Sequence, residues 1–98
     1  MTPKYKLRIK NGDLNGTTGH HTIQVHVREF RDDDTVVDGV PETFGIEPDA
    51  LQRKFGGDIK AWRQWVGKEM VKRHKIRMLA HAEVLNWSGR DFDIEENE

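Results

Sequence analysis

The chain has 98 residues, enough for one domain with a small core, because a chain of this length buries only about 60–70% of its unfolded surface. With 35% hydrophobic residues, 34% charged residues, a net charge of −1 and no cysteine, the composition predicts a folded, highly charged domain and excludes disulfides, thiolate zinc sites and cysteine nucleophiles. No apolar run approaches the roughly 18–20 residues that cross a bilayer, so we expect a cytoplasmic protein with no membrane partner.

Two strands are predicted at residues 5–10 and 22–30, because apolar and polar residues alternate there with a period of two. The apolar positions are Tyr5, Leu7, Ile9, Ile23, Val25 and Val27. Between the two strands, the glycine- and asparagine-rich residues 11–19 predict a surface loop. Phe30 breaks the alternation, which predicts a bulge or a change of sheet face near Glu29.

A third short strand and a two-turn helix are predicted next. The strand falls at residues 35–37 or at residues 42–44. The helix covers residues 48–55, because Pro48 suits a first helical position and the glycines at 56 and 57 end the turn.

A long helical pattern follows, from the N-cap residue Asp58 to the Ser-Gly pair at 88–89. At about 100° per residue, one apolar stripe collects Ile59, Trp62, Val66, Met70, Ala80, Val84 and Trp87. This stripe predicts that Trp62 and Trp87 belong to the core.

A continuous helix over this pattern would be about 43 Å long, whereas a compact 100-residue domain has a radius of gyration of about 13 Å. We therefore favour a bend or break at residues 73–75, with Ile76 and Leu79 packing on a rotated second half. A continuous helix that overhangs the domain is the alternative.

These elements predict an α+β fold. A small antiparallel sheet of two to three N-terminal strands packs against the short helix and the long, broken or unbroken, C-terminal helix. Residues 1–94 form a single domain, and residues 95–98 form an acidic, mobile tail.

Charge alternates along the chain in four blocks. Residues 1–28 carry five bases and one acid, residues 29–58 three bases and nine acids, residues 59–81 seven bases and one acid, and residues 82–98 one base and six acids. The blocks therefore have net charges of +4, −6, +6 and −5. A molecule with this pattern has strongly charged faces if the blocks stay apart after folding.

The basic block on the long helix supplies the candidate binding residues. They are Trp65, Lys68, Lys72, Arg73, Lys75 and Arg77. Arg73 and Arg77 fall inside the apolar stripe, so each needs a carboxylate, a partner surface or solvent. Trp65 lies beside the stripe, at a boundary position typical of interface anchors.

The chain has no recognisable metal or catalytic motif. Its five histidines form no HExxH or other zinc pattern, and the aspartates at 32–34 do not fit the ligand spacing of a calcium-binding EF-hand loop. GxSxG, P-loop and dinucleotide-binding patterns are also absent. We therefore expect no enzyme activity, no cofactor and no metal.

The sequence thus predicts a non-catalytic protein–protein interaction or assembly module that binds a protein partner or itself through charge-patterned surfaces, in a homo-oligomer or a larger assembly. The alternative is a nucleic-acid-binding protein that uses the basic helix 59–81. The small, cysteine-free, highly charged chain is in keeping with accessory or virion proteins of phages, which act in the host cytoplasm or the virion, although no motif supports that origin.

Overall fold

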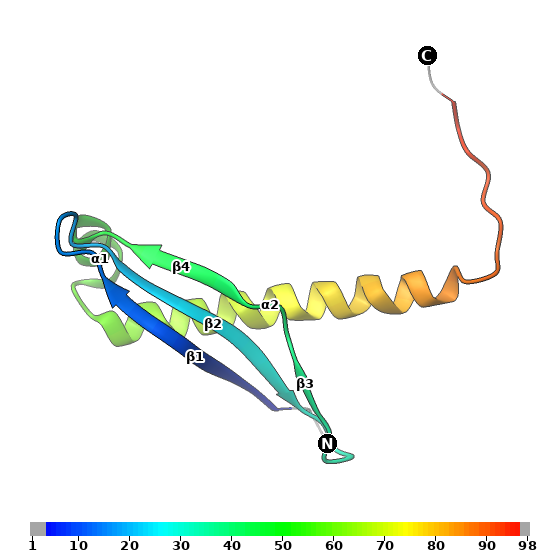
Figure 1. Cartoon of the computed structure of the whole chain (residues 1–98), viewed down its shortest axis with the longest axis horizontal. Helices are drawn as coiled ribbons and strands as arrows, with labels where there is room; N and C mark the ends of the chain where they lie inside the picture. The colour runs from blue at the N-terminus through cyan, green and yellow to red at the C-terminus, as the bar shows by residue number, and fades with distance from the viewer. Residues whose placement is uncertain (1–3, 97–98) are drawn as a thin grey trace.

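The computed structural model describes residues 4–96 and has the predicted α+β architecture (Figure 1). Four antiparallel strands are followed by two helices: β1 (Lys4–Leu14), β2 (His21–Phe30), β3 (Val36–Asp38), β4 (Glu42–Ile46), α1 (Pro48–Phe55) and α2 (Ile59–Asn86). β2 is the central strand, with β1 along one edge and both β3 and β4 along the other. Of the predicted tail 95–98, residues 97 and 98 lie outside the described residues.

The first two strands form where the alternation predicts them, but β1 continues to Leu14. The loop prediction is therefore wrong for residues 11–14, which pair with the beginning of β2. The turn starts at Asn15, whose side-chain oxygen accepts hydrogen bonds from the backbone N–H groups of Thr17 and Thr18. An asparagine that bonds the following backbone in this way reverses the chain over a few residues.

The predicted irregularity near Glu29 is wrong. The β1–β2 register runs without a shift from Phe30 to Val25, and the bulge lies in β1 between Ile9 and Asn11. Glu29 is buried and stays on the same face of β2 as the buried Val25 and Val27, because a helix side chain provides it with a hydrogen-bond partner.

Both alternatives for the third strand are present. β3 pairs with residues 28–30 of β2, and β4 pairs with residues 21–25. The two short strands therefore share one edge of β2 end to end, and the loop between them, around Gly39, lies against the middle of α2.

The predicted limits of α1 and the predicted start of α2 are confirmed. α1 starts at Pro48 and ends at Gly56, whose φ of 61° lies in the left-handed region that glycine adopts without strain. At the start of α2, the Asp58 carboxylate accepts hydrogen bonds from the N–H groups of Lys60 and Ala61, at 3.0 and 3.2 Å.

α2 is one continuous helix of 28 residues, so the favoured break at residues 73–75 is wrong. At 1.5 Å per residue it is about 42 Å long. The chain is extended, because both the second half of α2 and the segment after it reach away from the sheet (Figure 1): its radius of gyration is 18.4 Å, and it measures 53 × 48 × 20 Å. The second half of α2 projects away from the sheet, as Figure 1 shows.

The core lies between one face of the sheet and the first half of α2. It consists of Val25, Val27, Phe44, Ile46, Trp62, Val66 and Met70. Trp62 is a core residue as predicted, but Trp87 is 46% exposed, and Ile76 and Leu79 do not pack on a second surface. No helix among the described residues is long and apolar enough to span a membrane.

Candidate functional site

Two arginines of α2 hold the helix on the sheet by sharing one carboxylate of β4. Arg73 donates a hydrogen bond from Nη1 to Glu42 Oε1 at 2.8 Å, and Arg77 Nη2 lies 3.3 Å from Glu42 Oε2. The Arg73 guanidinium also lies over the Phe44 ring, 5.0 Å from its centre. Each of these arginines, which lie in the apolar stripe, needs a counter-charge, and Glu42 of the same chain provides it. This contact weakens both residues as candidates for binding a partner.

A buried acid–base pair lies beside this clamp. His74 Nε2 and Glu29 Oε1 are 2.9 Å apart, and the two residues are 3% and 8% exposed. The hydrogen bond from His74 lowers the pKa of Glu29, burial opposes this shift, and Arg31 adds a smaller lowering contribution. Glu29 is therefore ionised at neutral pH and accepts the Nε2 proton of His74.

The pair lies at the base of an open hollow of about 370 Å³, whose lining includes Tyr5. The Tyr5 ring meets the His74 ring edge to face, with centroids 6.1 Å apart. Sequence reasoning missed both members of the pair. The signals in the sequence were the place of Glu29 two residues after Val27 and the place of His74 four residues after Met70, both on apolar faces.

Beyond the clamp, α2 leaves the sheet. Every residue from 79 to 86 is exposed, although apolar side chains continue at helical spacing. Three of these side chains, together with Ile76 beside the clamp and the capping residue Trp87, form a surface that we call the overhang stripe: Ile76, Leu79, Ala80, Val84 and Trp87. Leu79 is 73% exposed.

The end of the overhang stripe is ordered by local contacts. Trp87 Nε1 donates to Glu83 Oε1 at 3.3 Å, and its ring meets Phe92 edge to face at 6.0 Å. Residues 90–96 then continue without helix or strand and are exposed. Their charge is mainly negative, from Asp91, Asp93, Glu95 and Glu96.

The three candidate lysines of α2, Lys68, Lys72 and Lys75, are exposed and lie within an arc of about 60° on the helix. Lys75 Nζ lies 5.4 Å from the centre of the Tyr5 ring. These lysines are therefore the part of the predicted basic surface that remains accessible on α2.

Trp65 lies at the boundary of the core. It is 45% exposed, and it meets Phe44 and Phe55 edge to face at 6.2 and 6.4 Å. These two contacts fix the ring, so the exposed part of Trp65 is a preformed surface.

Within residues 4–96, no group of three or more histidine, aspartate or glutamate side chains is arranged to hold a metal ion. No family model, curated protein or solved structure matches the chain. The functional inference therefore depends on the exposed surfaces and their charges.

Proposed function

We propose that the protein is a non-catalytic assembly module and that two copies associate through the overhang stripe. The observation that supports this function is an exposed apolar surface at helical spacing on the second half of α2. Apolar helix faces of this kind commonly bind a second helix.

A second copy of the chain is the partner that the charges favour. If two α2 helices pair antiparallel around residues 81–82, Trp87 of one copy lies opposite Ile76 of the other. The acidic residues that follow Trp87 then run along the basic part of the other helix. Under two-fold symmetry this attraction occurs twice.

The lengths of the segments are compatible with this arrangement. Residues 88–96, if extended, span about 30 Å. Lys68 and Lys75 are seven helical residues apart, or about 10 Å. The acidic segment of one copy can therefore reach all three exposed lysines of the other.

The acidic segment also supplies interface area. Specific interfaces bury about 800 Å² on each partner and combine an apolar centre with a polar rim. In the proposed dimer the overhang stripe is the centre, and the acidic segment with Lys68, Lys72 and Lys75 is the rim.

Analytical ultracentrifugation with Leu79→Glu tests the proposal. Leu79 is exposed at the rim of the hollow that it lines with Tyr5 and lies outside the core, so the variant should fold, and it places a charge within the proposed interface. We expect dimers for the unmodified protein at about 100 µM and monomers for Leu79→Glu, with a dissociation constant at least about 100-fold higher.

Leu14→Glu is the matched control, because Leu14 is an exposed apolar residue at the end of β1, near Ile59 at the start of α2 and so away from the overhang stripe. It should associate like the unmodified protein. A monomeric unmodified protein at that concentration, or equal weakening by both variants, would contradict the proposal.

The basic helix has less support as a nucleic-acid surface. Arg73 and Arg77 are already engaged with Glu42, so among residues 4–96 the candidate cations without an internal ion pair are Lys68, Lys72 and Lys75. Salt-dependent binding of a duplex by these three lysines alone would favour the alternative function.

A further inference from the structure

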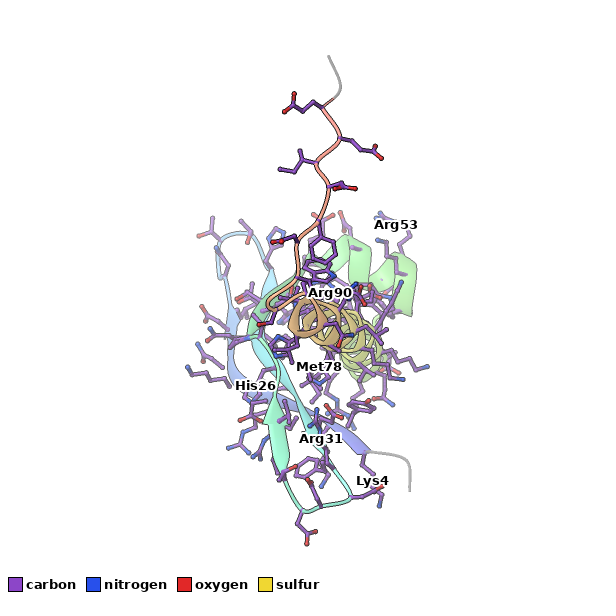
Figure 2. The ribbon with its side chains drawn as sticks, turned by 90° about the vertical axis from the view of Figure 1, so that its right-hand side faces the viewer. Lys4, His26, Arg31, Arg53, Met78 and Arg90 are labelled. Carbon is purple, nitrogen blue, oxygen red and sulfur yellow. The ribbon has the colours of Figure 1, made fainter. Side chains whose placement is uncertain are left out.

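The face of the sheet opposite α2 carries a second basic surface. Side chains alternate across a strand, so the residues next to the buried Val25 and Val27 point away from the helix. Figure 2, which looks along α2, shows the labelled His26 on the side of the sheet away from the helix. The basic residues of this face, which we call the open sheet face, are Lys4, Lys6, Arg8, Lys10, His26 and Arg28.

The strand register groups these side chains. Lys6 is paired with Arg28 and Arg8 with His26, while Lys10 lies at the bulge after Ile9 and lines the same shallow hollow as Arg8. The bulge therefore adds a cation to this face without interrupting the ribbon.

Two acids of this face, Asp13 and Asp38, partly balance this charge, and Asp13 lies beyond Asn11, opposite Thr22. Asp38 Oδ1 lies 3.0 Å from Arg28 Nε and 3.8 Å from His26 Nε2. Within the described part of the chain, no carboxylate lies at ion-pair distance from Lys6, Arg8 or Lys10. Three cations of β1 therefore remain accessible to an anionic ligand.

We propose that the open sheet face binds the major groove and flanking phosphates of double-stranded DNA. From Lys6 to Lys10 the strand covers about 13 Å, and neighbouring strands are about 4.8 Å apart. β1 is the outer strand of the sheet, and its pair with β2 is narrow enough for a major groove about 12 Å wide, while β3 and β4 continue the sheet on the other side of β2. This site is separate from the overhang stripe and does not depend on the proposed assembly.

The composition of the open sheet face favours a polyanion over a protein. Protein interfaces have an apolar centre with buried anchors. The aromatic ring on this face, Phe30, is flanked by Lys6 at 5.2 Å and by Arg28 at 5.5 Å from its centre. The two cations therefore occupy the position that an apolar partner would need.

The residues of the open sheet face also indicate which kind of nucleic acid it binds. Single strands bind to several exposed aromatic rings on which bases stack, whereas Phe30 is a single, flanked ring. Duplex RNA has a deep, narrow major groove that protein elements do not enter. B-form DNA is the duplex whose major groove accepts a ribbon.

The cross-strand pair Asn11 and Gln24 extends the basic surface at its far end. Asparagine and glutamine amides recognise adenine in the major groove, while lysine and arginine bind phosphates and guanine. The acidic β2–β3 turn, residues 31–35, lies at the Lys4 end, since Lys4 pairs with Phe30. We therefore place the DNA contacts between Lys6 and Gln24, away from that turn.

The test is fluorescence anisotropy of labelled duplex DNA of mixed sequence, measured from about 50 to 200 mM salt with the full chain. The test variant combines Lys6→Gln, Arg8→Gln and Lys10→Gln. It should bind at least about tenfold more weakly at the lowest salt. The slope of log K against log [salt] should be smaller by about 2.7, or about 0.9 for each phosphate that the variant no longer neutralises.

The matched control combines Arg53→Gln, Lys54→Gln and Lys60→Gln, which removes the same charge from exposed residues of α1 and the start of α2. It should keep the slope of the unmodified protein. Circular dichroism melting of both variants verifies that they fold. No binding at the lowest salt, equal weakening in the two variants, or tighter binding to duplex RNA or single-stranded DNA would overturn the proposal.

Discussion

Glu42 pairs with both Arg73 and Arg77, at 2.8 and 3.3 Å, so one carboxylate of β4 fixes two successive turns of α2. This relationship explains how an apolar stripe contains two guanidinium groups without a break in the helix. The clamp also marks where α2 leaves the sheet, because residues 79–86 are all exposed.

We predict that Glu42→Gln lowers the free energy of unfolding by about 1–2 kcal/mol. The substitution keeps the shape of the side chain but leaves two cations without their counter-charge at a part-buried position. The expected loss of unfolding free energy is modest because both arginines are about 40% exposed, and solvent screens their charges. Urea unfolding monitored by tryptophan fluorescence measures the change.

Glu47→Gln is the control for this experiment. Glu47 is exposed, and its Oε2 lies 4.0 Å from His20 Nε2. Its replacement should change the free energy of unfolding by less than about 0.5 kcal/mol. Equal effects of the two substitutions would show that the clamp does not stabilise the fold.

The Glu29–His74 pair predicts how stability depends on pH. The pKa of Glu29 in the folded state is lower than its ordinary value of 4.5, mainly because His74 donates a hydrogen bond to the carboxylate. The ionised form is therefore favoured by folding. Its contribution is fully present above pH 4.5 and disappears as the pH falls through the folded-state pKa.

Unfolding midpoints measured between about pH 7 and pH 3 should therefore fall less steeply with acid in Glu29→Gln than in the unmodified protein. Asp13→Asn, at an exposed position of β1, is the matched control. If the unfolding midpoints of the Glu29 variant and of the unmodified protein fall equally steeply with acid, the pair does not link protonation to folding.

A glycine inside α2 offers a stabilising substitution. Gly67 is helical, and a Cβ at this position would lie 3.9 Å from Leu7 Cδ2, an ordinary van der Waals contact. Gly67→Ala should raise the free energy of unfolding by about 0.5–1 kcal/mol, because alanine loses less backbone entropy on folding. For a domain of this size, the melting temperature should rise by about 2–8 °C.

Gly57→Ala is the opposite case and serves as the comparison. The φ of Gly57 is 81°, and a Cβ there would lie 2.9 Å from Gln52 Oε1. We expect this variant to melt at a lower temperature than the unmodified protein. A lower melting temperature for Gly67→Ala as well would indicate that the α2–β1 contact is tighter than the distance to Leu7 suggests.

Local signals predicted most of the secondary structure. The alternation in β1 and β2 and the caps at Pro48, Gly56 and Asp58 depend on residues close in sequence, and all are present. The open sheet face was also visible in the alternation of bases in β1, although the sequence-based prediction placed the binding surface on the helix.

The sequence-based predictions were wrong where the structure depends on contacts between residues that are distant in sequence. A break in α2 was favoured because the continuous helix is too long for a compact domain, whereas α2 stays whole and is held on the sheet by a contact between Arg73 and Glu42, 31 residues apart in sequence. Trp87 was assigned to the core because helical periodicity gives the direction of a side chain but not the point where the sheet beneath it ends. The registers between the strands required the structure.

The charge contacts of the proposed dimer give the last prediction. Removing three charges from α2, with Lys68→Gln, Lys72→Gln and Lys75→Gln, should weaken self-association about tenfold at low salt. The dissociation constant of this variant should then depend little on salt concentration. Neutralising the acidic segment, with Asp91→Asn, Asp93→Asn and Glu95→Gln, should have the same effect. Sedimentation equilibrium at two salt concentrations measures both.

Combining the two sets of substitutions separates a direct contact from a general effect of charge. If the acidic segment of one copy lies on the lysines of the other, each set removes the same interactions, so the combined variant should associate about as well as either set alone. If the two effects add, the segments act independently, and the antiparallel arrangement is wrong. Duplex DNA binding of the lysine variant should stay unchanged, because Lys68, Lys72 and Lys75 lie on α2 and not on the open sheet face.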